Sequence, residues 1–350
     1  METPIDFVIT WVNVYDGEWN EAYRKHKEEY CTRADRDKIL KTDGRKERYR
    51  DWGLLKYWFR GVEKYAPWVR KIHFITYGQL PKWLEEENPK LHVVRHGDYI
   101  PEKFLPTFNS NVLELYLHEI EGLSERFVYF NDDMFLMKKT APEDFFRKGK
   151  PCDMLAFQPV VANPSNPIMS RTLLNNSLVL SKYFSKRENV KRQPGKYFKI
   201  GYPPLYFWYN LLELYFPRYT GFYTVHGPSP FCKSTFKEVW EKERELLEQV
   251  SLNRFRSAGD VTQYLFREWQ KLSGNFEPLN LHRFFGYYEI GDDNEKLLKE
   301  MKKRKHRIIC INDARVSRDE DAVRAELCTA FEMSLPEKSA FEREALEEAL

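Results

Sequence analysis

The sequence predicts an α/β fold in which a mostly parallel sheet is flanked by helices and interrupted by a helical insert. Three observations support this prediction. Short apolar, β-branched runs alternate with segments whose apolar residues recur at helical spacing. Turn-forming or acidic residues directly follow several of the apolar runs. The chain of 350 residues is long enough for one large core that carries an insert, and it contains no internal repeat or low-complexity linker.

The chain begins with an alternation of predicted strands and a helix. The first strand, 5–12, ends in a turn-rich segment that contains Asp16. Asp51 stands at the N-cap position of the following helix, which Pro67 ends. The next two apolar, β-branched runs are predicted strands: 72–76 and 92–95. Because such strands are connected by helices, a parallel arrangement is expected.

A second helix is predicted before residue 122. Asn109 or Ser110 caps its start, and Gly122 ends it. Glu114 and His118 lie four residues apart and therefore on one face of such a helix. They form either a simple surface pair or part of a binding site.

Acidic and amide side chains follow two further predicted strands. The strand 127–130 runs directly into Asn131-Asp132-Asp133, and the strand 308–311 runs into Asn312-Asp313. Ligands of parallel sheets bind outside the carboxyl ends of the strands, so we expect these residues and Asp16 to share one rim. Their oxygen atoms suit Mg²⁺ or Mn²⁺, as in many nucleotide-sugar enzymes. The alternative is a set of structural turns in which Asp side chains bond the backbone.

The predicted elements divide the chain into three segments. The first half of the α/β core occupies 1–150. A loop-rich, aromatic and basic insert occupies 151–255 and carries the loop of His226. The segment 256–350 contains helices, the late core strand and a charged helical tail.

Two groups of basic or imidazole side chains are candidates for phosphate binding. His226 lies in a loop stiffened by Gly and Pro, where it can donate to a phosphate or relay a proton near neutral pH. The alternative is a loop histidine bonded to a backbone carbonyl. Arg48, Arg50 and Lys56 surround the start of the helix after Asp51, and arginine beside a helix N-terminus favours phosphate. A solvated basic helix start is the alternative there.

Two neighbouring stretches of the insert are unusual in composition. The stretch 182–196 is a basic loop with six Lys or Arg and one acid, Glu188, and it suits anionic lipid or pyrophosphate. The stretch 205–216 (LYFWYNLLELYF) is too short to span a bilayer. It is either core or an interfacial patch that meets a lipid-linked acceptor.

Composition excludes several classes of protein. A net charge of +3 without a long basic block argues against nucleic-acid binding. The N-terminal residues do not resemble a signal peptide, and no run of 18 apolar residues is present. We therefore expect a cytoplasmic enzyme, with the inner face of the cell membrane as the place of any lipid contact. The five cysteines include no CxxC pair, which predicts reduced, mostly buried thiols.

Four stretches, in order along the chain, carry a family resemblance. They are 5–13 followed by Asp16; the long stretch from 48 to 133; Val225-His226-Gly227-Pro228 followed by Arg256 and Asp260; and 308–313. The motifs of the long stretch are 48–51 (RYRD), 63–71 (EKYAPWVRK), 105–110 (LPTFNS), Glu114, His118, 122–125 (GLSE) and 130–133 (FNDD). Together they resemble the conserved regions of the Stealth family, the sugar-1-phosphate transferases of bacterial capsule and cell-surface polysaccharide synthesis.

The resemblance implies a reaction and a fold. Such enzymes transfer sugar-1-phosphate from a nucleotide-diphosphate sugar to a hydroxyl of a glycan acceptor, and they release nucleoside monophosphate. Their core is similar to that of GT-A glycosyltransferases, a Rossmann-like sheet, which agrees with the α/β prediction. For this chain the implied nucleotide-sugar-binding part is the segment 1–150, and the implied acceptor is a lipid-linked glycan.

The resemblance also implies roles for individual residues. The expected catalytic residues are Asp133, His226, Arg256 and Asp16. The expected substrate-binding residues are Asn13, Arg48, Asp51, Asn109, Ser110, Glu114 and His118. The expected ligands of Mg²⁺ or Mn²⁺ are Asp132, Asp133, Asn312 and Asp313. Arg48 and Arg256 would clamp phosphate oxygens. His226 would take the acceptor proton or steady the transferring phosphoryl group, with one of the two adjacent aspartates as the rival base.

Two other functions fit the residues without the resemblance. A metal-dependent glycosyltransferase would use the same donor and ion but would release nucleoside diphosphate. A non-catalytic saccharide-binding protein would use the aromatic side chains, although the clustered strand-end acids argue against it.

Overall fold

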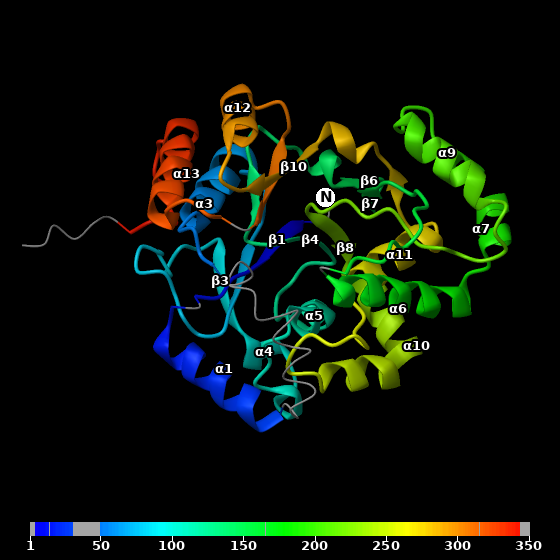
Figure 1. Ribbon diagram of the computed structural model, residues 1–350, viewed down its shortest axis with the longest axis horizontal. Coiled ribbons are helices and arrows are strands. Elements are labelled where there is room, and N and C mark those ends of the chain that lie inside the picture. The colour runs from blue at the N-terminus through cyan, green and yellow to red at the C-terminus, as the bar shows by residue number, and fades with distance from the viewer. Residues whose placement is uncertain (1–3, 14, 31–49, 165, 315, 344–350) are drawn as a thin grey trace, which may run out of the picture.

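The computed structural model describes residues 4–13, 15–30, 50–164, 166–314 and 316–343, with a five-stranded sheet at its centre (Figure 1). The strand order is β3-β2-β1-β4-β8, in which β8 is antiparallel to β4 and the other pairs are parallel. The strands are β1 Ile5–Thr10, β2 Ile72–Thr76, β3 Leu91–Arg95, β4 Arg126–Phe130 and β8 Ser229–Cys232. The predicted α/β class is confirmed, and the sheet is consistent with a GT-A-like core.

A second sheet brings the late strand to the end of β4. Its order is β10-β11-β5, with β5 Met134–Leu136, β10 Phe285–Ile290 and β11 Ile308–Asp313. Strand β5 follows Asp133 directly and pairs antiparallel with β11, with Met134 opposite Cys310. The backbone amide of Ile311 also donates to the carbonyl of Asp133 at 2.8 Å. The polar end of β11 therefore lies beside the turn after β4, as the strand-end argument predicts.

Helices cover both faces of the central sheet (Figure 1). Phe7 and Ile9 of β1 pack into a core with side chains of α3 Leu55–Tyr65, α12 Glu295–Lys303 and α13 Glu320–Ser334. Val8, which points to the opposite face, packs with side chains of α5 Ser110–Leu115, α10 Lys233–Ser251 and α11 Tyr264–Leu272. Because both faces are buried, β1 is apolar from Phe7 to Ile9, and the buried Asp6 before them is paired with Arg70.

The remaining elements complete the described chain. The helices are α1 Gly17–Tyr30, α3 Leu55–Tyr65, α4 His96–Tyr99, α5 Ser110–Leu115, α6 Pro167–Tyr183, α7 Lys186–Arg192, α8 Pro194–Tyr197, α9 Pro204–Glu213, α10 Lys233–Ser251, α11 Tyr264–Leu272, α12 Glu295–Lys303 and α13 Glu320–Ser334. Short 3₁₀ turns are Glu102–Phe104, Leu117–Glu119, Pro142–Asp144 and Leu281–Arg283. A small third sheet contains β6 Phe146–Arg147, β7 Lys150–Asp153 and β9 Glu277–Pro278. The predicted segment boundaries at 150 and 255 stay predictions, although β8 of the central sheet lies between them.

Two helix predictions near the site are wrong in detail. Asp51 does not cap α3, because Leu54 occupies the N-cap position and Asp51 accepts instead from the amide of Gly53 at 2.7 Å. Gly53 has a φ of +71°, a conformation that suits glycine in such a turn. Asn109 does cap α5, but that helix ends at Leu115 and a 3₁₀ turn follows. Glu114 and His118 are therefore not neighbours on one helical face.

The insert also differs from the sequence-based expectation. The basic stretch is not a loop, because it forms the end of α6 and the helices α7 and α8. The aromatic run forms α9 and the turn after it, and most of its apolar side chains are exposed, so its interpretation as core is wrong. Within the described residues, no helix combines the length and hydropathy that a membrane span requires. The four described cysteines are free, as predicted.

Candidate active site

A cavity of about 880 Å³ opens at the carboxyl ends of β4 and β11, next to the start of α3. A volume of this size is typical of a site for a small organic ligand. It brings together seven of the residues to which the resemblance assigns a role: Asp51, Asp132, Asp133, His226, Arg256, Asn312 and Asp313. The prediction that strand-end residues share one rim is therefore confirmed for two of the three strand ends.

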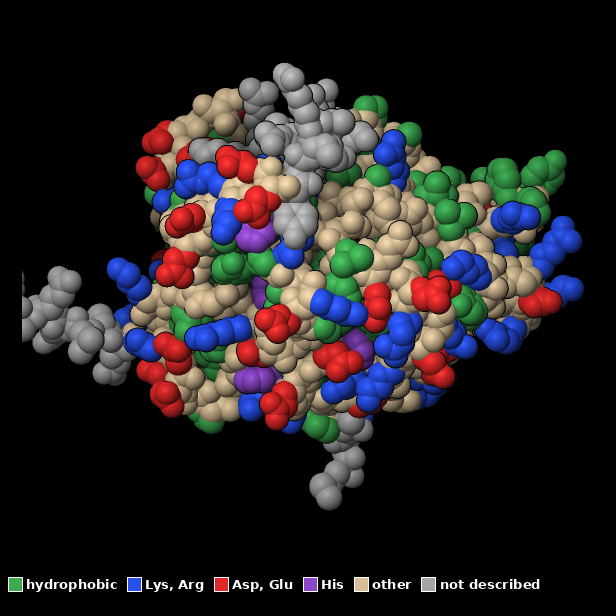
Figure 2. Space-filling view, turned by 90° about the horizontal axis from the view of Figure 1, so that it is seen from below, with side chains coloured by type: hydrophobic (Ala, Val, Ile, Leu, Met, Phe, Trp, Pro, Cys, Tyr) green, Lys and Arg blue, Asp and Glu red, His purple; other side chains and the backbone are tan. Residues whose placement is uncertain are grey.

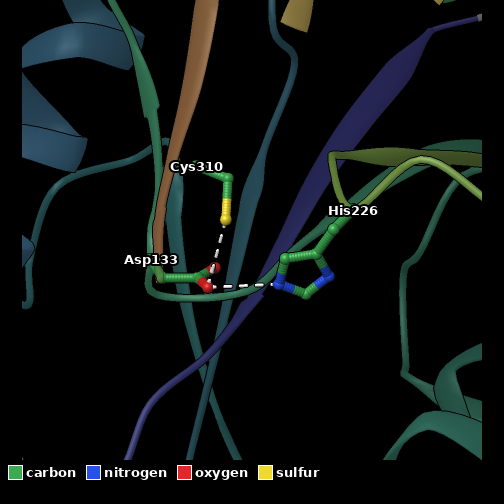
Figure 3. Close-up of side chains that lie close together, drawn as sticks. All are labelled: Asp133, His226 and Cys310. Carbon is green, nitrogen blue, oxygen red and sulfur yellow. Dashed lines mark hydrogen bonds and ion pairs between the residues drawn. The ribbon is translucent and has the colours of Figure 1, made fainter. Parts of the chain in front are cut away.

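Asp133 is the centre of a three-residue cluster in this cavity (Figure 3). Its Oδ2 lies 3.2 Å from Nε2 of His226 and 3.3 Å from Sγ of Cys310. These ligand-type atoms all lie within 4.8 Å of one another. Three distant parts of the sequence supply them: the turn after β4, the loop before β8 and the middle of β11. His226 also lies 3.4 Å, through Nδ1, from the hydroxyl of Tyr264.

The protonation of the cluster follows from its surroundings. Burial opposes a charge on His226, but the hydrogen bond and the negative charge of Asp133 outweigh it and raise the pKa of His226 above 6.5. Burial, together with Asp133, holds the pKa of Cys310 well above its ordinary value. The Cys310 thiol is therefore protonated and donates to Asp133. The pKa of the His226 imidazole therefore lies above the ordinary histidine value.

Asp132 lines the same cavity with a different electrostatic setting. Asp132 is exposed at the cavity surface, where the surrounding protein and then the negative charges of Asp133 and Asp51 raise its pKa to about 7. The carboxylates of Asp51, Asp132 and Asp133 repel one another, and a bound divalent cation would reduce this repulsion.

The end of β11 meets Arg50, which lines the cavity and which the sequence grouped with Arg48 as a candidate for phosphate binding. Nε of Arg50 donates to Oδ2 of Asp313 at 3.0 Å, and its Nη1 lies 3.2 Å from Glu320. Its guanidinium lies over the ring of Trp52, 4.7 Å from the centroid. The side-chain amide of Asn312 donates to the backbone carbonyl of Asp313 at 3.1 Å. Asp313 thus has a cation partner, which leaves Asp132 and Asp133 as the stronger candidates for metal ligands.

Arg256 reaches the cavity from a loop held by buried hydrogen bonds. Its Nη2 donates to Oγ of Ser110 at 2.5 Å. The loop is anchored at Asp260, which accepts from Asn109 at 2.9 Å and from the amide of Ser257 at 2.9 Å. Asn109 is fully buried and also caps α5. Asn109 therefore positions Arg256 from behind the cavity wall.

Glu114 is buried behind the cavity wall. It accepts from the Gln263 side chain at 3.4 Å and from the Tyr129 hydroxyl at 3.4 Å. Burial raises its pKa to about 7, although the charge of Arg256 and these hydrogen bonds act in the opposite direction. Glu114 therefore holds Gln263 and Tyr129 in place through hydrogen bonds, and it is not part of an exposed surface pair.

Three other predicted site residues lie away from the cavity lining. Asp16 accepts from the amide of Trp19 at 3.0 Å and so caps α1, a helix that the sequence analysis missed. The side-chain oxygen of Asn13 accepts from the backbone amide of Tyr15 at 3.0 Å. His118 is buried, lies 3.0 Å from Glu119 and stacks on Phe236. Arg48 lies outside the described residues, so its predicted role as a phosphate clamp stays a prediction.

Cys310 and Tyr264 contact the central cluster, although neither was predicted from the sequence. A signal for Cys310 was present, because alternate residues of a strand share a face and Cys310 lies two positions before Asn312. No comparable signal exists for Tyr264, since it reaches His226 from α11 through tertiary packing.

The residues present fit a hard divalent cation. Oδ1 of Asp133 is buried and has no hydrogen-bond partner among the described residues, so it retains bonding capacity for an ion or a substrate. Asp132 and the side chain of Asn312 supply further oxygen donors in the same cavity. The Cys310 thiol and His226 form a softer set with Asp133, but the raised pKa of the thiol disfavours its use as a ligand.

The sheet and its polar cavity define an α/β protein with a ligand site at the carboxyl ends of its strands. Residues 48–153 match the family model described as Stealth protein CR2, conserved region 2. That range contains Asp132 and Asp133 of the cavity.

Full-length relatives agree with this match. The chain is 42% identical to a capsular polysaccharide phosphotransferase of Streptococcus pneumoniae, over 97% of this chain and 98% of the relative. It is 37% identical to an exopolysaccharide phosphotransferase of Lactiplantibacillus plantarum, over 97% and 96%. It is 36% identical to a receptor polysaccharide phosphotransferase of Streptococcus oralis, over 97% and 99%. The chain therefore belongs to the Stealth family of phosphotransferases.

Proposed function

We propose that this protein transfers a sugar-1-phosphate from a nucleotide-diphosphate sugar to a hydroxyl of a glycan acceptor in capsular or cell-surface polysaccharide synthesis. The acceptor oxygen forms a bond to the phosphorus that carries the sugar. The bond from that phosphorus to the bridging oxygen of the pyrophosphate breaks, and nucleoside monophosphate leaves. The acceptor proton passes to a base of the enzyme, and the product is a phosphodiester.

One observation carries this proposal: the His226–Asp133 pair shares a cavity with Arg256 and with strand-end carboxylates. Phosphoryl transfer requires positioning of the phosphate, stabilisation of its negative charge and a group that accepts a proton. Arg256 supplies a cation, the carboxylates supply an ion site, and His226 supplies the proton acceptor. The names of the relatives, all polysaccharide phosphotransferases, support the same reaction class.

We assign roles within the pair from its geometry. Asp133 holds the imidazole through Nε2, and the hydroxyl of Tyr264 lies on its Nδ1 side. His226 in its neutral form takes the acceptor proton, and Asp133 stabilises the imidazolium that results. Arg256, oriented by Ser110, binds oxygens of the transferring phosphate.

We further propose that Asp132 and Asp133, assisted by Asn312, hold Mg²⁺ or Mn²⁺. When bound, the ion neutralises charge on the donor pyrophosphate. The carboxyl of Asp132 must be ionised to serve as a ligand, and its pKa of about 7 means that the ion competes with a proton there. Metal affinity should therefore fall as the pH decreases below about 7.

The nucleotide product tests the proposal. The full chain is incubated with Mg²⁺, a panel of UDP- and GDP-sugars and a lipid or oligosaccharide acceptor extract, and the nucleotides are resolved by chromatography. Acceptor-dependent nucleoside monophosphate is the expected product, and it should disappear with EDTA and return with added Mg²⁺. Nucleoside diphosphate would instead identify a glycosyltransferase that uses the same site.

A further inference from the structure

Helix α9 has the reverse of the usual amphipathic pattern. The side chains that it buries against the protein are Tyr206, Asn210 and Glu213, at spacings of four and three residues. Its remaining face is strongly apolar and exposed. In a surface helix that packs on its own core the apolar face points inward, so this arrangement needs a reason.

Polar interactions fix the helix in this orientation. Asn210 is fully buried; it accepts from the amide of Phe157 at 2.7 Å and donates to the carbonyl of Tyr197 at 2.6 Å. Glu213 forms a buried ion pair with Lys186 of α7 at 3.1 Å. Rotating α9 to bury its apolar face would expose or break these bonds, which are costly to lose inside a protein. The outward apolar face is therefore a built feature of the fold.

The exposed apolar side chains form a group that we call the α9 patch. The exposed fraction is 57% for Trp208, 62% for Leu212 and 88% for Tyr215. The patch consists of Leu205, Phe207, Trp208, Leu211, Leu212, Leu214, Tyr215 and Phe216. Large contiguous apolar groups of this kind mark surfaces that bind a membrane or another protein.

Positive charge accompanies the α9 patch. Residues 182–218 contain eight Lys or Arg and two Glu, a net charge of +6, within a chain of net charge +3. The rest of the chain is therefore net acidic. Arg187, Lys191 and Arg218 of this stretch are exposed. Figure 2 shows hydrophobic side chains beside Lys and Arg at the end of the molecule that α7 and α9 form in Figure 1.

We propose that the α9 patch docks on the surface of an anionic lipid bilayer. Aromatic and leucine side chains on one face of a helix, next to Lys and Arg, are the chemistry of an interfacial membrane helix. A second copy of this chain is disfavoured as the occupant, because the exposed Arg187, Lys191 and Arg218 of one copy would repel those of the other. The apolar side chains enter the headgroup region, and the basic side chains bind the lipid phosphates.

The same insert forms a wall of the cavity. Met169, Ser170 and Leu173 of α6 line it. In the chain, α6 is followed by α7, α8 and α9. Docking would therefore hold the cavity close to the bilayer. Only the further step, that this favours a lipid-linked acceptor, rests on the proposed function.

Vesicle flotation of the full chain tests the docking surface without requiring activity. Phosphatidylcholine vesicles are compared with vesicles that contain 30% phosphatidylglycerol. The wild type should float with the anionic vesicles, and increasing salt should weaken its binding. Trp208→Glu/Leu212→Glu should reduce the affinity by a factor of roughly ten or more, because charge enters the apolar face. Arg187→Ala/Lys191→Ala should reduce it by roughly tenfold on anionic vesicles alone.

A matched control places the same changes on exposed apolar residues elsewhere. Leu252, which follows the last residue of α10, is 63% exposed, and Met333 of α13 is 77% exposed. Leu252→Glu/Met333→Glu should float as the wild type does, and circular dichroism should show all variants folded. The proposal is overturned if the wild type does not float with anionic vesicles, or if Trp208→Glu/Leu212→Glu floats equally well. A wild-type dimer that Trp208→Glu/Leu212→Glu converts to monomer, by sedimentation velocity, would assign the α9 patch to self-association instead.

Discussion

Asp133 and Asp260 are two buried or half-buried aspartates with opposite hydrogen-bond settings. Asp260 is fully buried, and both of its oxygens accept hydrogen bonds, from Asn109, Asn111, Asn253 and the Ser257 amide. Asp133 lines the cavity, and its Oδ1 has no hydrogen-bond partner within the described part of the chain. The first aspartate has used its bonding capacity to hold a loop, whereas the second has kept capacity for a ligand.

The contrast extends to the other residues that the family motifs contain. Asp132, His226 and Arg256 line the cavity, whereas Asn109 and Glu114 lie behind it. Residues of both groups are polar and lie in matching motifs, so their sequence context alone does not separate them. Substitutions of residues that line the cavity should reduce turnover with little effect on stability. Substitutions of residues behind the cavity wall should reduce stability with little effect on turnover.

Asp133→Ala should have the largest effect on activity. It removes a proposed metal ligand and the partner of His226, so we expect turnover to fall by about 10³-fold or more. The free energy of unfolding should change by less than about 1 kcal/mol, since Asp133 is not saturated with structural hydrogen bonds. Nucleotide release and urea unfolding measure the two quantities. Wild-type turnover by folded Asp133→Ala protein would remove Asp133 from the mechanism.

Asp260→Ala should show the opposite pattern. It removes the acceptor of the buried Asn111 side-chain amide and one of the three acceptors of the Asn109 side-chain amide, so the free energy of unfolding should fall by about 3 kcal/mol. The protein that remains folded at low temperature should keep a turnover within about tenfold of the wild type, because Asp260 does not line the cavity and Arg256 keeps its hydrogen bond to Ser110. A loss of turnover as large as that of Asp133→Ala, without a loss of stability, would contradict the distinction.

His226→Asn should reduce turnover by about 10²-fold, the usual contribution of a general base. Asparagine retains a polar side chain but does not accept the acceptor proton. In a companion measurement, NMR titration of Asp133→Asn should give His226 a lower pKa than in the wild type, because the raising interaction is lost. An unchanged turnover in His226→Asn would transfer the role of base to the aspartates.

The fold was predictable because the central strands β1, β2 and β4 are buried on both faces. Mostly apolar runs such as that of β1, in which Asp6 is the one charged residue, favour a strand inside a covered sheet, and β2 agrees with its predicted range. Helix α1 escaped prediction because it is mostly polar, with Trp19 as its one fully packed side chain before residue 30. Helix α9 was assigned to either of two settings because its buried side is polar, which composition does not reveal.

The site was predictable where a residue follows a strand. Asp132, Asp133, Asn312 and Asp313 reach one cavity because strand ends in a sheet are brought to a common edge. Asp16 follows β1 in the same way, but the intervening turn is long enough for it to cap α1 instead. Contacts such as His226 with Tyr264 depend on how the insert packs on the core, and no local pattern records that.

Glu114→Gln tests the group behind the cavity through pH. Folding raises the pKa of Glu114 from 4.5 to about 7, so the folded state binds this proton more tightly than the unfolded chain does. Wild-type stability therefore falls as the pH rises from 4.5 toward 7, and glutamine removes that fall. Relative to the wild type, Glu114→Gln should gain about 2 kcal/mol between pH 5 and pH 8. Any constant cost of the amide is present at both pH values, so the difference isolates the titration. Parallel pH profiles of the two proteins would show that Glu114 is ionised in the fold across this range.

Asp16→Ala should have the smallest effect, although Asp16 belongs to one of the stretches that carry the family resemblance. Its carboxylate accepts from the amide of Trp19, and that hydrogen bond, with help from Gln79, lowers its pKa. Loss of an N-cap costs about 1 kcal/mol of stability. Turnover should stay within about threefold of the wild type, because Asp16 lies outside the cavity lining. Asp16→Asn, which keeps a side chain able to cap, should restore most of the stability. A 10²-fold loss of turnover in both variants would instead place Asp16 with the cavity residues, and it would require a movement of the turn after β1 when the donor binds.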